Sequence, residues 1–527
     1  MSSCIVRTES LGGSKLSRAA RDGQLREWYV PVPSDRAAWA EYGARVRDTV
    51  NADWLDKLRD AIAPAGRAAL RLERSAGGRG LVVTTGQQPG LFGGPLMSLV
   101  KAISARALAD TLQDLLGIPV APVFWAATDD ADFDEAAVVS VALDGGAREL
   151  ALEPAAPAGT PMSRVPIGED VVALSEYLRE ASGSAPHASF LDAAIAAYHP
   201  GTTVGDAYLA LLRQLLEPLE IAVLDASHPS VARAGDALLR RAVSRAASVA
   251  DAVRMRSEAI GARGFTPQVE EVRGLSLVFL NVNSTKRRLS LTDAAAVGDL
   301  GEHQFLSPTV LLRPVLERAI LPTATYVGGP GEYAYFAQVS AVADALDTPA
   351  PMVMPRWSAS LLEPRVARLL ERLEVAPEAL ADPNAVESLV ARRRLSPDAD
   401  AAMHALRGAT ASSVDALRAA NDGLVSDAVL DGLQRSIEHR VERAERRFLA
   451  GVKRREAEVM REIGTVRGAL YPHGAPQERK LAYVAFLARY GPALLDEMLE
   501  AARAHARGLV AGAPSLGRSP SSAPARV

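Results

Sequence analysis

The sequence contains a single cysteine, Cys4, among its 527 residues. One thiol excludes an internal disulfide framework and any zinc site built from cysteines. Cys4 is also a poor candidate for a catalytic nucleophile, because nothing in the polar N-terminal stretch around it places a base nearby. Chemistry that depends on a protein thiol is therefore not expected.

Long hydrophobic runs and a strong net charge are missing as well. No window has the ~18 near-continuous apolar residues that cross a bilayer, and the N-terminus lacks the apolar core of a signal peptide. A formal net charge of −4 gives no electrostatic support for binding nucleic acid. These absences predict a cytoplasmic protein with neither membrane nor nucleic acid as a partner. A hydrophobic share of 48% is typical of globular domains.

The most organised stretch runs from Leu81 to Glu135. Residues 81–85 form a β-compatible apolar run, residues 98–116 follow a helical period, and residues 120–125 form a second apolar run. Strand, helix and strand in this order predict a βαβ unit and hence a parallel sheet. Ligands bind beyond the carboxyl ends of such strands. A glycine-rich segment follows the first strand, and an acidic segment follows the second.

The α/β pattern continues and then stops. Residues 221–224 predict another strand, and residues 323–327 begin a second βαβ unit with a helix over 333–346. Strand patterns vanish after Leu361. The charged stretch 424–463 has apolar residues at broken helical spacing, which indicates a helical hairpin or a coiled coil.

The glycine-rich segment from Gly86 to Pro95 is a candidate anion site. Such a loop supplies backbone N–H groups at a helix N-terminus, where the helix dipole also favours negative charge. It matches neither the dinucleotide fingerprint nor the P-loop. A tight turn whose glycines permit close packing is the alternative. The residues assigned here to binding are Gly86, Gln87, Gln88, Gly90 and Gly93.

The acidic run from Asp129 to Glu135 is the second candidate. It lacks the glycine and glutamate positions of a calcium-binding EF-hand loop. Carboxylates at the carboxyl end of a strand suit an ammonium group or Mg²⁺, and we assign this role to Asp130 and Asp132. The outer residues Asp129 and Asp134 are interpreted as solvated. No histidine has metal-ligand spacing, and no residue is assigned to a resident metal site.

The third candidate is Glu332, which follows a second glycine turn. It is either a functional carboxylate at the sheet edge or a favourable partner of the helix dipole. Arg356, after the last strand, either binds a substrate carboxylate or forms a salt bridge at the edge of the core. The glycines of this turn assigned to binding are Gly328, Gly329 and Gly331.

Several blocks of this chain resemble a known family. They are Thr85–Pro95 with Lys101–Ile103, Pro122–Trp125 with Asp130–Glu135, Gly264–Val269, Ser307–Val310, Arg313–Pro314, Leu321–Pro322, Tyr326–Glu332 with Tyr335, Pro355–Arg356 and Gln477–Arg479. In these blocks the sequence resembles the BshC family, the cysteine-adding enzymes of bacillithiol biosynthesis. It departs from the family pattern at Ala131, where the family usually has histidine.

The resemblance implies a domain arrangement. It implies a Rossmann-like parallel-sheet core over residues 1–360, with inserted connecting segments near 136–200 and 283–320. A helical coiled-coil domain over 361–467 would mediate homodimerisation. A loop and helix over 468–510 would return toward the core, and the composition of 511–527 predicts a disordered tail.

The resemblance also implies a reaction, the joining of cysteine's carboxyl to the amine of glucosaminyl-malate. ATP, or ADP with Mg²⁺, is expected to take part in activation, with no tightly bound cofactor. Asp130, Asp132 and Glu332 are the predicted catalytic residues, and Trp125, Tyr326 and Arg356 join the glycines as substrate- or nucleotide-binding residues. The alternative function is a catalytically impaired dimer that binds a nucleotide or metabolite and recruits a partner through its coiled coil.

Overall fold

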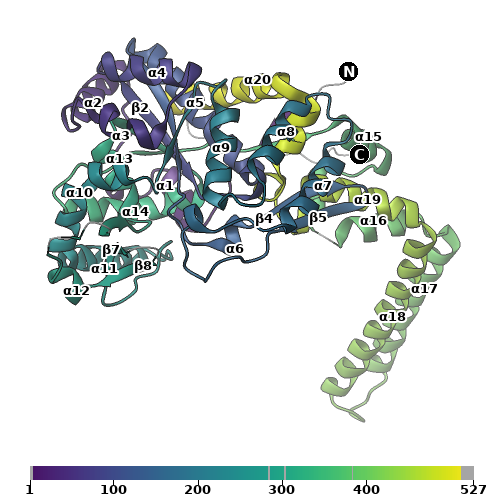
Figure 1. The fold of residues 1–527 in the computed structure, drawn as a ribbon. Helices are drawn as coiled ribbons and strands as arrows, with labels where there is room; N and C mark the ends of the chain where they lie inside the picture. The colour runs from purple at the N-terminus through teal and green to yellow at the C-terminus, as the bar shows by residue number, and fades with distance from the viewer. Residues whose placement is uncertain (1–3, 283–284, 299, 302–303, 383, 512–527) are drawn as a thin grey trace. The chain divides into compact units, whose positions relative to one another are not determined.

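A computed structural model of the chain describes residues 4–282, 285–298, 300–301, 304–382 and 384–511. The chain forms two compact units (Figure 1). The first contains the chain up to Val141, Glu149–Leu361 and the chain from Glu478 onward; the second contains Ala142–Arg148 and Leu362–Gln477. Residues 468–477, grouped above with the C-terminal helix, thus belong to the second unit. Apart from Ala511, the predicted tail lies outside the described residues.

The core of the first unit is a five-stranded parallel sheet with the order β11-β10-β2-β3-β6. Both predicted βαβ units are present. The chain runs from β2 outward to β3 and β6, and then returns to β10 on the other side of β2. The order therefore reverses between β2 and β10, which is where α/β sheets bind ligands. The strands are β2 Leu81–Gln87, β3 Val120–Ala126, β6 Ala222–Asp225, β10 Thr323–Gly328 and β11 Val353–Pro355.

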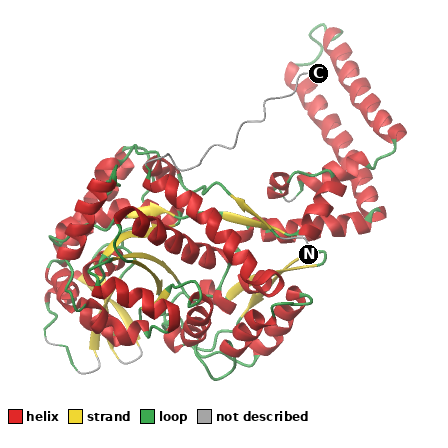
Figure 2. Cartoon of the chain, turned by 90° about the horizontal axis from the view of Figure 1, so that it is seen from above, coloured by secondary structure: helices red, strands yellow, loops and turns green. Residues whose placement is uncertain are grey.

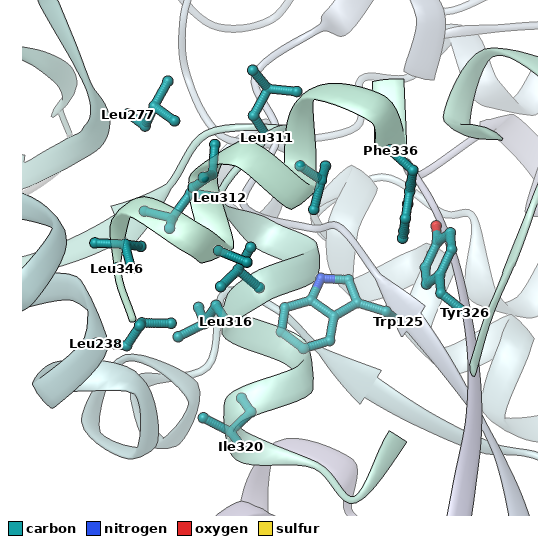
Figure 3. Packing of buried hydrophobic residues seen from close by; sticks show 14 of the residues in the cluster. Trp125, Leu238, Leu277, Leu311, Leu312, Leu316, Ile320, Tyr326, Phe336 and Leu346 are labelled. Carbon is teal, nitrogen blue, oxygen red and sulfur yellow. The ribbon is translucent and has the colours of Figure 1, made fainter. Parts of the chain in front are cut away.

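Helices cover this sheet because its strands are apolar on both faces. Val82, Val123 and Leu224 belong to one buried cluster with side chains of the helices that follow β6 and flank β10. Figure 3 shows the indole of Trp125 between Leu316 and Tyr326 in this cluster. The helices on this side are α10 Pro229–Ser244, α13 Arg313–Ile320 and α14 Pro330–Ala345. Helix α5 Leu96–Leu116 packs on β2 and β3, and α20 Tyr483–Val510 packs against α5.

Two insertions interrupt the sheet. The first, between β3 and α9 (Val204–Leu216), contains β4 Val138–Leu143, β5 Gly146–Ala151, α7 Asp170–Ser182 and α8 Ala188–Ala197. The second contains an antiparallel sheet of order β8-β7-β9, formed by β7 Leu275–Val282, β8 Thr285–Ser290 and β9 Gln304–Pro308, with α12 Leu291–Ala295. It begins earlier than the predicted 283, because β7 is the central strand of the inserted sheet.

The remaining elements of the first unit lie mostly at its N-terminus. A short strand β1 pairs with β12, which the sequence analysis did not anticipate. No helix in the described part of the chain is long and apolar enough to span a bilayer. The remaining α-helices and strands of the first unit are β1 Ile5–Thr8, α1 Lys15–Arg21, α2 Arg36–Asp48, α3 Trp54–Ile62, α4 Gly66–Gly77, α6 Phe133–Ala136, α11 Ala246–Ala262 and β12 Ala359–Leu362.

The second unit is helical, as predicted. Figures 1 and 2 show α17 and α18 side by side as a hairpin. Ion pairs Arg418–Asp431 and Arg407–Glu445 show that these helices run antiparallel. The prediction placed a helical hairpin or a coiled coil within 424–463. The hairpin instead pairs α18 with the preceding α17, and the chain breaks at Glu456 before α19. The helices are α15 Pro364–Leu373, α16 Ala385–Arg393, α17 Pro397–Ala419, α18 Asp427–Arg455 and α19 Ala457–Leu470.

Candidate functional site

A buried ion pair lies where β2 and β10 end. Lys101 Nζ is 2.6 Å from Glu332 Oε2, and it donates to the Gly86 carbonyl at 2.5 Å and to Gln87 Oε1 at 3.0 Å. Glu332 also accepts a hydrogen bond from the Tyr326 hydroxyl. An ammonium group has three hydrogens, so each has an acceptor here. The pair connects the first glycine segment to the second.

Glu332 is held in its ionised form. Burial by itself would raise its pKa, but the charge of Lys101 and the hydrogen bonds from Lys101, Tyr326 and the Gly329 N–H outweigh burial and lower the pKa. The Gly329 N–H donates to Glu332 Oε2 at 2.8 Å, so the carboxylate also caps α14. This geometry matches the dipole-partner alternative. A carboxylate with a lowered pKa is a weak base.

The acidic turn lies at the same edge of the sheet. Gln88 Nε2 donates to Asp130 Oδ2 at 2.7 Å, and Asp130 Oδ1 accepts from the Asp132 N–H at 3.1 Å. Asp132 in turn caps α6 by accepting from the Glu135 N–H at 3.1 Å. Because Gln87 and Gln88 are consecutive, the structure brings the first glycine segment, the acidic turn and Glu332 together.

The glycine turn after β2 does not present free donors to an anion at its end. The Gly93 N–H donates to the Gly90 carbonyl at 2.9 Å, and the Leu96 N–H at the start of α5 donates to the Leu481 carbonyl at 2.8 Å. Gly93 has φ +86°, and a Cβ added there would lie 2.2 Å from the Tyr483 hydroxyl. Close packing, the alternative interpretation, explains Gly93, and the anion site at this turn stays a prediction.

At the second glycine turn, Gly328 and Arg356 are confined by their neighbours, whereas Gly331 is not. A Cβ at Gly328 would lie 3.1 Å from Val353 Cγ2, whereas one at Gly331 would meet only Gln268 Nε2 at 3.9 Å. Arg356 is buried, and its two terminal nitrogens bind the carboxylate of Glu478 at 2.9 and 2.5 Å. The salt-bridge alternative therefore describes Arg356.

A cavity of about 300 Å³ lies beyond the carboxyl ends of β3 and β6. Trp125 is the predicted site residue that lines it. This residue is buried, and its indole N–H has no hydrogen-bond partner among the residues that the structure describes. Asp129, which we interpreted as solvated, also lines the cavity and pairs with Lys286 at 3.1 Å. The polar lining includes Asp129, Arg164, Ser227, His228, Asn281 and Arg313.

Most of the chain, from residue 46 to residue 508, is similar to one family. Residues 46–303 and 301–357 match the model of the bacillithiol biosynthesis BshC N-terminal Rossmann-like domain, and residues 359–508 match that of the BshC C-terminal coiled-coil domain. The chain belongs to the BshC family. The match of the coiled-coil model includes α20, which packs with the first unit in this structure.

Curated members of the BshC family are similar to this chain over most of its length. A protein from Koribacter versatilis named "Putative cysteine ligase BshC" is 31% identical over 88% of this chain and 89% of its own length. One of the same name from Solibacter usitatus is also 31% identical, over 80% of this chain and 82% of its own length. One from Salinibacter ruber is 29% identical over 80% of this chain and 81% of its own. We therefore class this BshC-family chain as a ligase.

Three residues that reach this site were not assigned from the sequence. Lys101 and Arg313 lie in blocks that resemble the BshC family, and a lysine within the apolar stretch 99–103 was a usable indication of buried charge. Glu317 is also buried; burial, with Glu332 adding to it, raises its pKa to about 7, although Arg313 and the Thr84 hydroxyl oppose this. Among the described residues, no group of three or more His, Cys, Asp or Glu side chains is arranged to hold a metal ion.

Proposed function

We propose that this BshC-family ligase joins the carboxyl group of cysteine to the amine of glucosaminyl-malate, forming the amide of bacillithiol. Relatives named as cysteine ligases and a family named for bacillithiol biosynthesis support this substrate pair. The structural observation that carries the proposal is the cavity of about 300 Å³ at the carboxyl edge of the sheet. Such cavities with a few polar groups are the usual location of small-molecule sites.

The chemistry assigns different tasks to the groups at this edge. An amine must lose a proton before it attacks a carbonyl, so a carboxylate or imidazole near the amine is needed. Asp129 and His228 line the cavity, and Asp130 and Asp132 belong to the same acidic turn as Asp129. We assign binding of the ammonium group and acceptance of its proton to this turn. Glu332, held ionised by Lys101, positions the ends of β2 and β10 instead.

Amide formation from a free carboxylate is uphill in water, so the carboxyl group needs activation. ATP, or ADP with Mg²⁺, stays our prediction for the activating nucleotide. Mg²⁺ commonly binds through one or two carboxylates plus substrate phosphates, and Asp130 and Asp132 are the carboxylates we propose for it.

The proposed reaction is tested with purified protein, cysteine and glucosaminyl-malate. Mass spectrometry should detect bacillithiol with ATP, or with ADP and Mg²⁺, and the arm without a nucleotide measures the need for activation. No product in any arm would favour the alternative, an impaired nucleotide- or metabolite-binding dimer. Product that appears only after Ala131→His would support the same alternative, because histidine usually stands there in the family.

Replacing Asp132 by asparagine should reduce turnover without unfolding the protein. Asparagine caps helices as well as aspartate does, so α6 is retained while the negative charge is lost. We expect kcat to fall by about 10² or more, the usual contribution of a proton-transfer group, with an unchanged Tm. Asp134→Asn, an exposed change in the same turn, is the matched control. Wild-type kcat in Asp132→Asn would remove this residue from the proposed site.

We also propose that the hairpin of α17 and α18 mediates homodimerisation. Several large apolar side chains on it are solvent-exposed in the single chain, including Phe448 at 52% and Leu417 at 52%. Exposed apolar residues gathered on one element favour a protein partner, and the match to a coiled-coil domain supports a helical one.

The dimer proposal predicts that Phe448→Glu shifts the protein toward monomer. A buried glutamate would be desolvated without a partner, which weakens the interface. Light scattering after size-exclusion chromatography measures the mass. Met255→Glu, at an exposed site on α11 (63%), should leave the mass unchanged. A monomeric wild type, or a dimeric Phe448→Glu, would contradict the proposal.

A further inference from the structure

Arg313 lines the cavity and has no carboxylate within ion-pair distance among the described residues. Its Nη2 donates to the hydroxyls of Tyr335 at 3.2 Å and Tyr326 at 3.4 Å, and its Cζ lies 5.5 Å from the centroid of the Tyr326 ring. Hydroxyl oxygens carry no charge that would balance the cation. The charge of Arg313 is therefore available to an anion in the cavity.

The surroundings of the guanidinium group support such a ligand. A Cβ added at Gly86 would lie 3.0 Å from Arg313 Nη1, so the glycine leaves space beside the cation. Trp125 lines the same cavity with its unpartnered indole N–H. A buried donor without an acceptor costs free energy. An oxyanion would balance the charge of Arg313 and would accept a hydrogen bond from the Trp125 indole.

A buried carboxyl group lies one helical turn after Arg313. One oxygen of Glu317 accepts from the Thr84 hydroxyl, whereas Oε2 has no hydrogen-bond partner in the described part of the chain. Burial raises the pKa of Glu317 to about 7, so its charge changes near neutral pH. The titratable and charged groups that face it are Arg313 on its own helix, Tyr326 on β10, and Glu332 and Tyr335 on α14.

We propose that Arg313 binds a carboxylate of the substrate and that Glu317 is a positioning residue whose negative charge weakens this binding. While Glu317 is neutral, the buried cluster contains two cations, Lys101 and Arg313, and one carboxylate, Glu332, which pairs with Lys101. When Glu317 ionises, positive and negative charges in the cluster balance, and the field of Arg313 in the cavity falls. The choice of a carboxylate ligand rests on the proposed function, in which both substrates are carboxylic acids.

The test measures binding of L-malate to the full-length protein by isothermal titration calorimetry at pH 6, 7 and 8 and constant ionic strength. Malate stays fully ionised over most of this range, so the protein dominates the pH dependence. We expect the Kd to rise about tenfold from pH 6 to pH 8, because Glu317 loses its proton over this interval. Glu317→Gln should bind at every pH as tightly as the wild type does at pH 6.

Two further variants separate the roles. His228 also lines the cavity and is the control position there. Its replacement by asparagine, which still caps α10, should keep the pH slope if Glu317 is its source. Arg313→Gln should lose both the malate affinity at pH 6 and its dependence on pH. This variant tests the role of Arg313 even if Glu317→Gln does not fold.

The inference is overturned if Glu317→Gln keeps the wild-type slope, if Arg313→Gln binds malate normally at pH 6, or if the wild type binds none. Product formation is measured on the same preparation. Product with pH-independent malate binding would overturn this inference and leave the proposed function in place. If the Kd for malate rises with pH but no product forms, this inference stands and the proposed function is contradicted.

Discussion

Replacing Lys101 by methionine is expected to lower the free energy of unfolding by about 3–5 kcal/mol, the usual effect of removing one partner of a buried ion pair. Methionine fills much of the same space but cannot donate to Glu332, Gly86 or Gln87. Glu332 would then remain buried without its cation, and its pKa would rise because the charge and the hydrogen bond of Lys101 contribute most to lowering it. Urea denaturation followed by circular dichroism at pH 7 measures the change.

A double-mutant cycle provides the control for this prediction. Glu332→Gln removes the opposite charge, and the double variant Lys101→Met with Glu332→Gln should recover a large part of the stability lost in Lys101→Met alone. Recovery is expected because no unpaired charge remains in the core. A loss below about 1 kcal/mol in Lys101→Met would place the pair at the level of a surface salt bridge and refute its structural role.

Arg356→Met is expected to be about as damaging, with a loss of about 3–5 kcal/mol. Arg356 is 1% exposed and holds Glu478 through two hydrogen bonds, and Glu478 is itself buried at 7% exposure. The substitution would leave the carboxylate of Glu478 buried without a cation. Differential scanning calorimetry of Arg356→Met, and of the double variant with Glu478→Gln, measures the cost and its relief.

This experiment also separates the two interpretations of Arg356 made from the sequence. If the side chain serves the salt bridge, the double variant regains stability and its KM for glucosaminyl-malate stays near the wild-type value. A stable Arg356→Met variant with a many-fold higher KM would instead show that Arg356 binds substrate.

Local patterns predicted most of the sheet and its helices. The period-2 and period-3.6 patterns around β2, α5 and β3 depend on residues close in the chain, so they indicate the same elements before and after folding. The strand β1 was missed because four residues carry little pattern and its partner, β12, lies some 350 residues away.

The candidate site was predicted less completely, for a related reason. Glycine turns and the acidic run are visible in the sequence, and the structure brings them to one sheet edge. What each group contacts is not visible there. From the sequence Glu332 had two interpretations, and the structure pairs it with Lys101. Asp129 was interpreted as solvated, but it pairs with Lys286. The role of Glu317 follows only from its burial beside Arg313.

By itself the sequence determined an α/β chain with a helical C-terminal part, a set of glycine turns and carboxylates at strand ends, and its family. These follow from composition, short-range periodicity and similarity, which need no coordinates. Only the tertiary structure decided which glycines serve packing, which charges are neutralised and which residues line the cavity. Those outcomes depend on contacts between residues far apart in the chain, and on the loss of water around them, which changes the free energy of every buried charge.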